Sequence, residues 1–264
     1  MESIYKYPRT RHVEGSGLQP GDEDLAVAPF AALAGRHLVV EEKMDGANSA
    51  ISFTPEGRLL LQSRGHYLAG GPRERQFDLF KRWASRYAGE LWAALGSRYV
   101  LYGEWLFAKH TIFYTDLPHY FLEFDALDTM DGAFLSTARR RALLRDAPFI
   151  APVHVLHEGQ VASHAALRAL IGPSRFIAGG PGDALARLRA EATASGLDAE
   201  RAAAETDASG LMEGLYIKVE EDGVVRERYK YVRRGFLQTV LDSGSHWMER
   251  PILSNGLRPG VELF

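Results

Sequence analysis

The stretch LVVEEKMDGANSAISF, residues 38–53, decides the fold because two strand-like runs flank a short polar turn. Residues 37–42 and 48–54 are rich in apolar and β-branched side chains, and the Asp-Gly pair between them is a turn signal. The segment TPEG (54–57) then turns the second run into RLLLQS (58–63). Strand-like runs joined by such short turns predict an antiparallel meander.

Further strands and helices are predicted along the chain. A three- and four-residue apolar period from Pro72 to a stop at Gly96 predicts one amphipathic helix. Because strands pair with neighbouring strands and helices stand to the side, the pattern predicts an α+β fold. The other predicted strands are 99–107, 119–127, 149–156 and a pair around Asp222-Gly223, and the other predicted helices begin near Ser136 or Thr137 and span 163–172.

The composition of the chain shifts once, at residues 178–210, where Ala, Gly, Arg and Glu dominate. We interpret this segment as a mobile helical insertion on the surface. It lies inside a domain predicted over residues 1–234. Residues 235–264 carry Pro, Gly and Asn with little periodicity, so they predict a short packed extension, too short for a further five-stranded barrel.

The bulk composition excludes several classes of protein. The chain has 264 residues, 46% of them hydrophobic, which suffices for a sizeable core. It has no cysteine, which excludes disulfides, cysteine nucleophiles and cysteine-bound metal. We find no apolar run of 18 residues and no apolar leader, so we expect no membrane span and a cytoplasmic location. The formal charge of −3 argues against general coating of nucleic acid by the protein but is compatible with a local basic groove.

Lys43 is the candidate nucleophile. It ends an apolar run immediately before a turn, so its amine is expected to project into a cleft. A lysine attacks only when it is deprotonated, and the neighbouring Glu42 and Asp45 favour its charged form. The arrangement therefore suits catalysis if a metal ion or another cation offsets those acids.

Other polar and aromatic residues complete a phosphate-binding pattern. Glu104 and Glu213 each interrupt an apolar strand and are candidate ligands of magnesium. Taken singly, a charged residue in a strand is also compatible with a solvated or ion-paired position, and Phe124 with a place in the core. The candidate phosphate contacts are Arg64, Lys218, Arg228 and Lys230, and the candidate face for stacking a base is Phe124.

The order of these elements resembles a known superfamily. K-x-D-G, S-R-G, Y-G-E, F-D, E-G-x-x-I-K and a basic K-Y-V-R strand follow one another over residues 43–233. This order resembles the covalent nucleotidyltransferases, which include polynucleotide ligases and RNA capping enzymes. The variant K-x-D-G-x-N and the segment 103–125 look most like the RNA ligase family, nearest the phage RNA ligase 2-like group. The resemblance implies an ATP-grasp-like ligase adenylation domain of antiparallel sheets flanked by helices, without a C-terminal OB-fold.

The resemblance also implies roles for single residues. Lys43 would attack the α-phosphorus of ATP to form lysyl-AMP, and Asp45 would order the lysine loop. Arg228 stands where the family commonly has lysine, which leaves its role open, and Arg9 near the N-terminus is either a phosphate contact or structural. The implied catalytic residues are Lys43, Asp45, Glu213 and Lys230; the nucleotide-binding residues are Glu42, Lys43, Asn48, Arg64, Glu104, Phe124, Lys218 and Lys230; the metal ligands are Glu213 and Glu104.

By the same resemblance, the protein would be an ATP-dependent RNA ligase. It would use ATP with Mg2+ or Mn2+, adenylylate an RNA 5′-phosphate and join it to a 3′-hydroxyl, with a separate end-healing kinase or phosphatase as a possible partner. The alternatives are a non-catalytic module that binds nucleotides or RNA ends, and a DNA ligase or capping-type nucleotidyltransferase. The implied RNA-binding residues are Asn48, Arg64, Lys109, His110 and Arg233.

Overall fold

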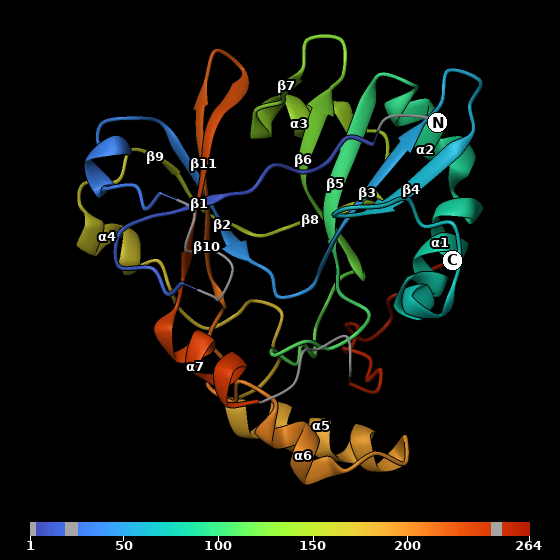
Figure 1. Ribbon diagram of the computed structural model, residues 1–264, viewed down its shortest axis with the longest axis vertical. Coiled ribbons are helices and arrows are strands. Elements are labelled where there is room, and N and C mark those ends of the chain that lie inside the picture. Colours follow the sequence, from blue (N-terminus) through green and yellow to red (C-terminus); the bar gives the residue numbers. More distant parts are fainter. Residues whose placement is uncertain (1–3, 19–25, 244–249) are drawn as a thin grey trace.

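The computed structural model describes residues 4–18, 26–243 and 250–264, and within them the strands form two sheets that stand next to each other (Figure 1). The strand order of the first sheet is β1 (Arg11–His12), β11 (Val224–Val232), β10 (Gly214–Glu221), β2 (Leu38–Lys43) and β9 (Val155–Gly159). The order of the second is β4 (Leu59–Ser63), β3 (Ala47–Phe53), β5 (Tyr99–Trp105), β6 (Phe121–Asp128) and β7 (Ala133–Phe134), with β8 (Ala151–Pro152) beside β6. The predicted α+β fold with antiparallel sheets is confirmed.

Alternation along the strands gives the first sheet one apolar and one polar face. Val40, Leu215 and Ile217 share a buried apolar cluster on one face. Lys43 and Lys218 belong to the alternate positions of β2 and β10, and Gly214 lies opposite Lys43 in the antiparallel register. The polar face is the one from which the candidate nucleophile projects. The turn between β10 and β11 has Asp222 and Gly223 at positive φ, as the predicted hairpin requires.

The second sheet carries the larger core, which helices pack against (Figure 1). Phe80 and Trp83 from the helical segment pack on Phe121 of β6, with ring centroids 5.3 and 5.8 Å away. The sequence predicts one helix here, but the structure has a 3-10 turn η2 (Pro72–Phe77), α1 (Asp78–Arg86) and α2 (Ala88–Leu95). The break falls at Tyr87, whose ψ of 20° is not helical and whose ring stacks on Phe149 at 4.7 Å.

The segment predicted as one strand at 149–156 is divided between the two sheets. β8 pairs with β6 in the second sheet, whereas β9 pairs with β2 in the first. Between them the Val153 amide donates to the Glu123 carbonyl, and the Glu42 amide donates to the His154 carbonyl, both at 2.9 Å. The chain therefore passes from the second sheet to the first between β8 and β9. The apolar content of residues 149–156 does not reveal this passage.

The remaining helices begin at recognisable caps. Ser136 accepts a hydrogen bond from the Arg139 amide, as expected for the helix predicted there, and Ser163 accepts one from the Ala166 amide. Figure 1 shows α5 and α6, which form the predicted insertion, projecting at the end of the molecule away from the hairpin β10–β11. The bounds are η1 Phe30–Ala32, α3 Thr137–Leu143, α4 His164–Arg168, α5 Pro181–Ala194, α6 Ala199–Ala204 and α7 Arg234–Asp242.

The C-terminal residues pack back on the domain. After α7, residues 244–249 lie outside the described part, and residues 250–264 run along the loops that precede β6. Ser254 bridges Ala108, and the buried Asn255 side chain donates to the Leu106 carbonyl at 2.8 Å. The domain boundary at residue 234 stays a prediction, and α7 itself was not foreseen.

Across the described ranges, none of the helices has the length and apolar character needed to cross a membrane. The cytoplasmic location stays a prediction.

Gly214 should be indispensable for the pairing of β10 with β11. A Cβ atom at this position would lie 1.9 Å from the Tyr231 carbonyl oxygen, which is backbone and cannot rotate away. We expect Gly214→Ala to lower the free energy of unfolding by about 1–3 kcal/mol or more, measured by urea denaturation. The control is Gly89→Ala in α2, where nothing lies within 4 Å, and it should be neutral or stabilising by at most about 1 kcal/mol. Equal stability of Gly214→Ala and the wild type would contradict this register of the two strands.

Candidate active site

A single cleft collects most of the residues that the sequence singles out. It lies between the polar face of the first sheet and the second sheet, and encloses about 710 Å3 of empty space, part of it open to solvent. It is lined by Tyr7, Thr10, Glu41, Glu42, Lys43, Met44, Asn48, Arg64, Glu104, Phe124, Val153, Tyr216 and Lys230. Residues of both sheets, of the turn after β2 and of the N-terminal segment therefore line the same cleft.

Lys43 ends β2 with its amine in this cleft. Its Nζ lies 2.7 Å from Glu213 Oε1, and 24% of the side chain is exposed. Burial disfavours the charged amine, but the nearby Glu213 and Glu104 carboxylates outweigh burial and raise the pKa of Lys43. The protein by itself therefore keeps this lysine protonated, as expected from the surrounding acids.

Glu104 and Glu213 are the acidic partners of Lys43. Burial raises the pKa of Glu104 to about 8, although Lys43 acts in the opposite direction. Burial likewise raises the pKa of Glu213 to about 7, again opposed by Lys43. Burial disfavours the ionised form of both carboxyl groups, and a cation bound next to them would stabilise that form.

The donor set fits a divalent cation that is shared with phosphate. Magnesium commonly binds one or two carboxylates and completes its shell with water and substrate phosphates. Within the described ranges no three or more His, Asp or Glu side chains gather as a complete metal cage. Glu104 and Glu213 therefore suit a cation that arrives with a nucleotide better than a permanently held one.

Asp45 is held by the loop that follows β5. Its Oδ2 accepts hydrogen bonds from the amides of Thr111 and Ile112, both at 2.7 Å, and its own amide donates to the Tyr114 hydroxyl at 2.9 Å. His110 lies behind it, with Nδ1 4.0 Å from Asp45 Oδ1. This anchoring fixes the turn after Lys43, which supports the ordering role expected for Asp45.

Glu42 is tied to the segment that precedes the insertion. Its Oε1 accepts from the Ser174 hydroxyl at 2.5 Å and its Oε2 from the Arg175 amide at 3.3 Å. Burial raises the pKa of Glu42 to about 7, and the bond from Ser174 lowers it in part. The carboxyl is thus held in one orientation at the wall of the cleft.

Aromatic rings form another wall. Phe124 lies edge-on to Tyr7 at 5.2 Å between centroids and at 50° to Tyr216 at 5.8 Å. Only 9% of Phe124 is exposed, so it joins the core and the cleft at once. Rings of this kind offer apolar area for a planar base.

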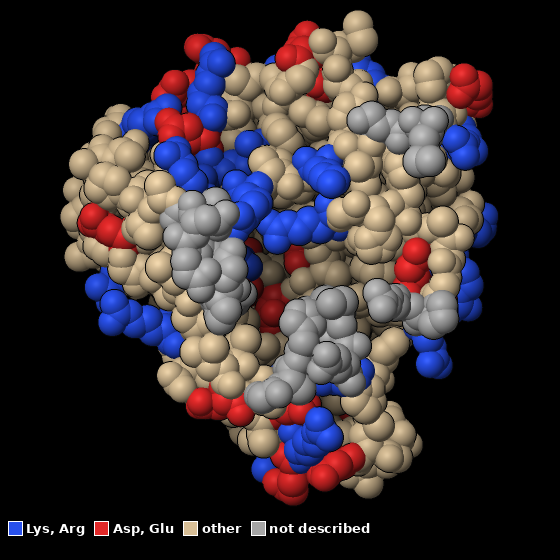
Figure 2. All heavy atoms as spheres, in the orientation of Figure 1, with Lys and Arg blue, Asp and Glu red and all other residues tan. Residues whose placement is uncertain are grey.

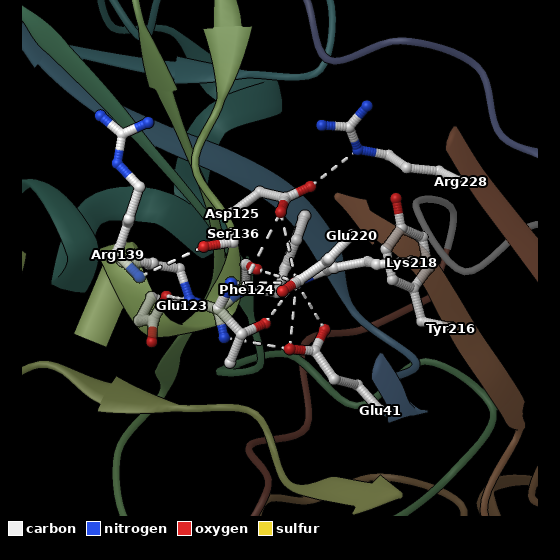
Figure 3. Close-up of polar contacts among 12 residues, drawn as sticks. Glu41, Glu123, Phe124, Asp125, Ser136, Arg139, Tyr216, Lys218, Glu220 and Arg228 are labelled. Carbon is white, nitrogen blue, oxygen red and sulfur yellow. Dashed lines mark hydrogen bonds and ion pairs between the residues drawn. The ribbon is translucent and has the colours of Figure 1, made fainter. Parts of the chain in front are cut away.

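Behind Phe124 lies a buried cluster of charged residues that joins the two sheets (Figure 3). Lys218 Nζ lies 2.9 Å from Glu41 Oε2 and 3.2 Å from Asp125 Oδ1, and also contacts the Phe124 carbonyl oxygen. Arg228 Nε donates to Asp125 Oδ2 at 2.9 Å. Lys218 and Asp125 have no exposed surface.

Arg140 of α3 completes this cluster. It lies 3.0 Å from Glu41 and 2.9 Å from Glu123, so three acids face three bases. Burial would raise the pKa of Asp125, but the cations, Lys218 and Arg228 foremost, lower it to about 2. The cluster is balanced in charge, and it holds the backbone on both sides of Phe124.

The structure brings most of the sequence-predicted residues to the cleft, but not all. Asn48 and Arg64 line it, and Asn48 lies opposite Glu104 in the register of β3 and β5. Lys218 was expected at nucleotide phosphates, yet its amine is enclosed by two carboxylates and does not line the cleft. Arg228 is engaged by Asp125 and lies over the Phe134 ring at 3.7 Å.

Three residues expected to bind RNA make contacts that hold loops together. Lys109 Nζ donates to the Glu205 carbonyl at 3.1 Å, and burial lowers its pKa to about 8. His110 is 3% exposed behind Asp45. Arg233 donates to the Met212 carbonyl at 3.1 Å and contacts Asp207. Their contact with RNA stays a prediction.

Several residues of the site escaped the sequence reasoning. Tyr7 and Thr10 belong to the N-terminal segment KYPRT (6–10), which fits the RNA ligase family, but in this segment only Arg9 was considered as a phosphate contact. Tyr216 could have been found, because it stands two residues before Lys218 on β10 and side chains two residues apart lie on the same face of a strand. Glu41 and Arg140 have no signal beyond being charged residues within apolar patterns.

The cleft is acidic at its floor and basic at its rim. Figure 2 shows acidic side chains at the bottom of a hollow in this face and Lys and Arg side chains gathered above it. Glu42 and Glu104 line the cleft together with Arg64 and Lys230. Such a site attracts a polyanion at the rim and a cation at the floor.

Comparison with known proteins gives one family. The sequence model of the RNA ligase family matches residues 36–232. Among solved structures, a mutant of the Naegleria gruberi RNA ligase with ATP and Mn has 17% identity, covers 89% of this chain and 58% of its own, and gives a TM-score of 0.54. A mutant with AMP and Mn gives 0.54 at 18% identity, covering 90% and 59%.

The same ligase with PPi gives a TM-score of 0.52 at 17% identity, covering 80% of this chain and 53% of its own. The chain therefore spans little more than half the length of these solved ligases. No curated protein sequence matches it significantly. At such low identity the solved structures establish the likeness of the fold.

Removing the charge of Asp125 should destabilise the protein strongly. In Asp125→Asn the cations Lys218 and Arg228 stay buried without their shared carboxylate, so we expect a loss of about 3–5 kcal/mol in the free energy of unfolding. The low pKa of Asp125 has a second consequence: its contribution to stability is present above about pH 4 and is lost as the pH falls toward about 2.

Urea denaturation at pH 7 and at acid pH measures both effects. Asp222→Asn is the control, because Asp222 is 84% exposed and its pair with Arg226 is worth at most about 1 kcal/mol. Similar losses for the two variants would contradict the role of the buried cluster.

Proposed function

The chain belongs to the RNA ligase family, and from this premise we propose that it is an ATP-dependent RNA ligase that works through a covalent lysyl-AMP intermediate. The observation that carries the proposal is the position of Lys43, whose amine enters the cleft 2.7 Å from Glu213. The similar Naegleria gruberi RNA ligase was solved with ATP and Mn, with AMP and Mn, and with PPi, which supports the choice of nucleotide and metal.

In the first step Lys43 Nζ attacks the α-phosphorus of ATP. A phosphorus–nitrogen bond forms, the bond from the α-phosphorus to the bridging oxygen breaks, and pyrophosphate leaves with the bonding electrons. Lys43 must first lose a proton, which Glu104 and Glu213 oppose while they are ionised. Glu104 and Glu213 would hold a divalent cation, which would supply positive charge to offset these acids and the phosphates.

The residues around the cleft bind and orient ATP in this proposal. Phe124 stacks on the adenine, and Glu42, held by Ser174, faces its edge. Asn48, Arg64 and Lys230 contact ribose or phosphate from the remaining walls. Such positioning and charge neutralisation are the main contributions of proteins to phosphoryl transfer.

The later steps use the activated AMP. An oxygen of the RNA 5′-phosphate attacks the phosphorus of lysyl-AMP, so the phosphorus–nitrogen bond breaks and a pyrophosphate link joins AMP to RNA. A 3′-hydroxyl then attacks the RNA phosphorus, loses its proton and displaces AMP. The substrates are therefore 5′-phosphate and 3′-hydroxyl ends, which a separate kinase or phosphatase would prepare where RNA is broken with other ends.

A capping-type enzyme and a non-catalytic binding module, the alternatives to an ATP-dependent ligase, differ from it in which labelled nucleotide becomes attached to the protein. Incubation with α-labelled ATP or GTP, followed by denaturing electrophoresis, separates them. Labelled protein from ATP supports an ATP-dependent ligase, whereas labelling from GTP indicates a capping-type enzyme. Label from neither nucleotide indicates a binding module. Sealing of RNA rather than DNA ends then distinguishes an RNA ligase from a DNA ligase.

Lys43 should be needed for the first step but not for the last. We expect Lys43→Ala to abolish labelling by ATP and ATP-dependent sealing, yet to keep measurable sealing of an RNA supplied with a pre-adenylylated 5′ end. Lys43→Arg should not restore labelling, because a guanidinium stays protonated and is a poor nucleophile. Gel assays of both reactions test this, and a Lys43→Ala protein that still takes label from ATP would refute the assignment.

Glu213 should affect the reaction more than the fold. Glu213→Gln keeps the size of the side chain and removes its charge, so we expect labelling by ATP to fall by about 100-fold while the free energy of unfolding changes by less than about 1 kcal/mol. Labelling should also need Mg2+ or Mn2+ and stop in excess chelator. Parallel losses of stability and labelling would indicate a structural carboxylate, and full activity in chelator would exclude the metal.

A further inference from the structure

The N-terminal residues 5–12, here called the strap, run from the second sheet to the first (Figure 1). At one end the Tyr5 carbonyl accepts hydrogen bonds from Gln62 Nε2 on β4 and the Tyr102 hydroxyl on β5, both at 2.8 Å. At the other end β1 pairs in parallel with β11, with His12 opposite Lys230. The strap is therefore fastened to both sheets.

The inner side of the strap belongs to the cleft. Tyr7 and Thr10 are 7% exposed and line the cavity. The Tyr7 hydroxyl donates to Asp125 Oδ2 at 2.5 Å and contacts the Tyr216 hydroxyl. These contacts fix which side of the strap faces inward and which faces solvent.

The outer side carries cations next to an exposed aromatic ring. Lys6, Arg9 and Arg11 are exposed, and 44% of Tyr5 is exposed although its backbone is anchored. Arg11 pairs with Glu227 at 2.8 Å. Figure 2 shows Lys and Arg side chains gathered above the hollow, in the region where Figure 1 draws the strap. None of these residues is needed to explain the binding of ATP in the cleft.

We propose that the outer face of the strap binds single-stranded RNA, with Lys6 and Arg9 at its phosphates and Tyr5 stacked on an unpaired base. Cations that follow an exposed aromatic ring along one segment of backbone offer the two contacts, phosphate pairing and base stacking, that bind single strands without reading their sequence. Residues 5–11 span up to about 23 Å when extended, enough for a short stretch of strand. The inner side of the strap is also a wall of the proposed nucleotide site. RNA bound to the outer side would therefore lie close to the reacting end.

This inference rests on the proposed function, because it names where the RNA substrate lies. A protein partner would also be attracted by cations, but the exposed Tyr5 ring, anchored at the end of the strap next to Lys6, favours a ligand that has both phosphates and flat bases. Duplex RNA offers phosphates with its bases already stacked, so it would use Lys6 and Arg9 and gain nothing from Tyr5.

The test compares three variants of the full chain in binding a fluorescent 5′-phosphorylated single-stranded RNA over a range of salt. For Lys6→Ala/Arg9→Ala we expect about tenfold weaker binding, and a slope of log Kd against log salt reduced by about 1.4, for two lost phosphate contacts. For Tyr5→Ala we expect about 5- to 150-fold weaker binding, with Tyr5→Phe close to the wild type. In both, RNA sealing should fall relative to ATP labelling of the same protein.

The matched control is Arg82→Ala/Arg86→Ala, two exposed arginines of α1, which changes the net charge equally. This control should keep the salt slope of the wild type. Equal effects of control and strap variants, or strap variants that bind as well as the wild type, would overturn the proposal. An equal loss of blunt duplex binding by Tyr5→Ala would overturn the stacking. If the wild type takes no label from ATP, the proposed function fails, while the RNA titrations still decide the strap.

Discussion

The contact of Asp125 with Lys218 and Arg228 is the constraint on which the arrangement of the two sheets depends. Asp125 stands on β6 of the second sheet, whereas the two cations come from β10 and β11 of the first. Asp125 and Lys218 are fully buried and the Arg228 side chain is only 11% exposed, so a displacement of one sheet would leave a charge without its partner at a cost of several kcal/mol. Apolar packing alone has no comparable demand for one arrangement, because it is not directional.

The active site inherits its geometry from this constraint. Phe124 is held between the buried neighbours Glu123 and Asp125, and Lys218 also contacts its carbonyl oxygen. On the first sheet, Glu41 joins the same cluster two residues before Lys43. In the proposed reaction, the base on Phe124 and the phosphorus near Lys43 would be placed by backbones that share one electrostatic anchor, and small errors of placement are costly in group transfer.

Opposed charges organise the surroundings of Lys43. Its acidic neighbours raise its pKa, so the lysine is held in its charged form. The rim carries the opposite charge, from Arg64 and Lys230 in the cleft to the exposed cations of the strap. In the proposed function, such a distribution would keep Lys43 unreactive before nucleotide binds and would attract polyanionic substrates.

The amino-acid sequence alone was enough to predict most strands, the hairpin at Asp222-Gly223, the α+β class and the motifs that contain Lys43, Asp45, Glu104, Phe124 and Glu213, because local periodicity and short motifs are properties of neighbouring residues. It was not enough to predict that residues 149–156 divide between two sheets, that Lys218 is enclosed by carboxylates, or that Tyr7 lines the cleft. Whether a charged side chain binds a ligand or another side chain depends on which distant residues approach it. That pairing arises only when the two sheets meet, and so it is a property of the tertiary structure.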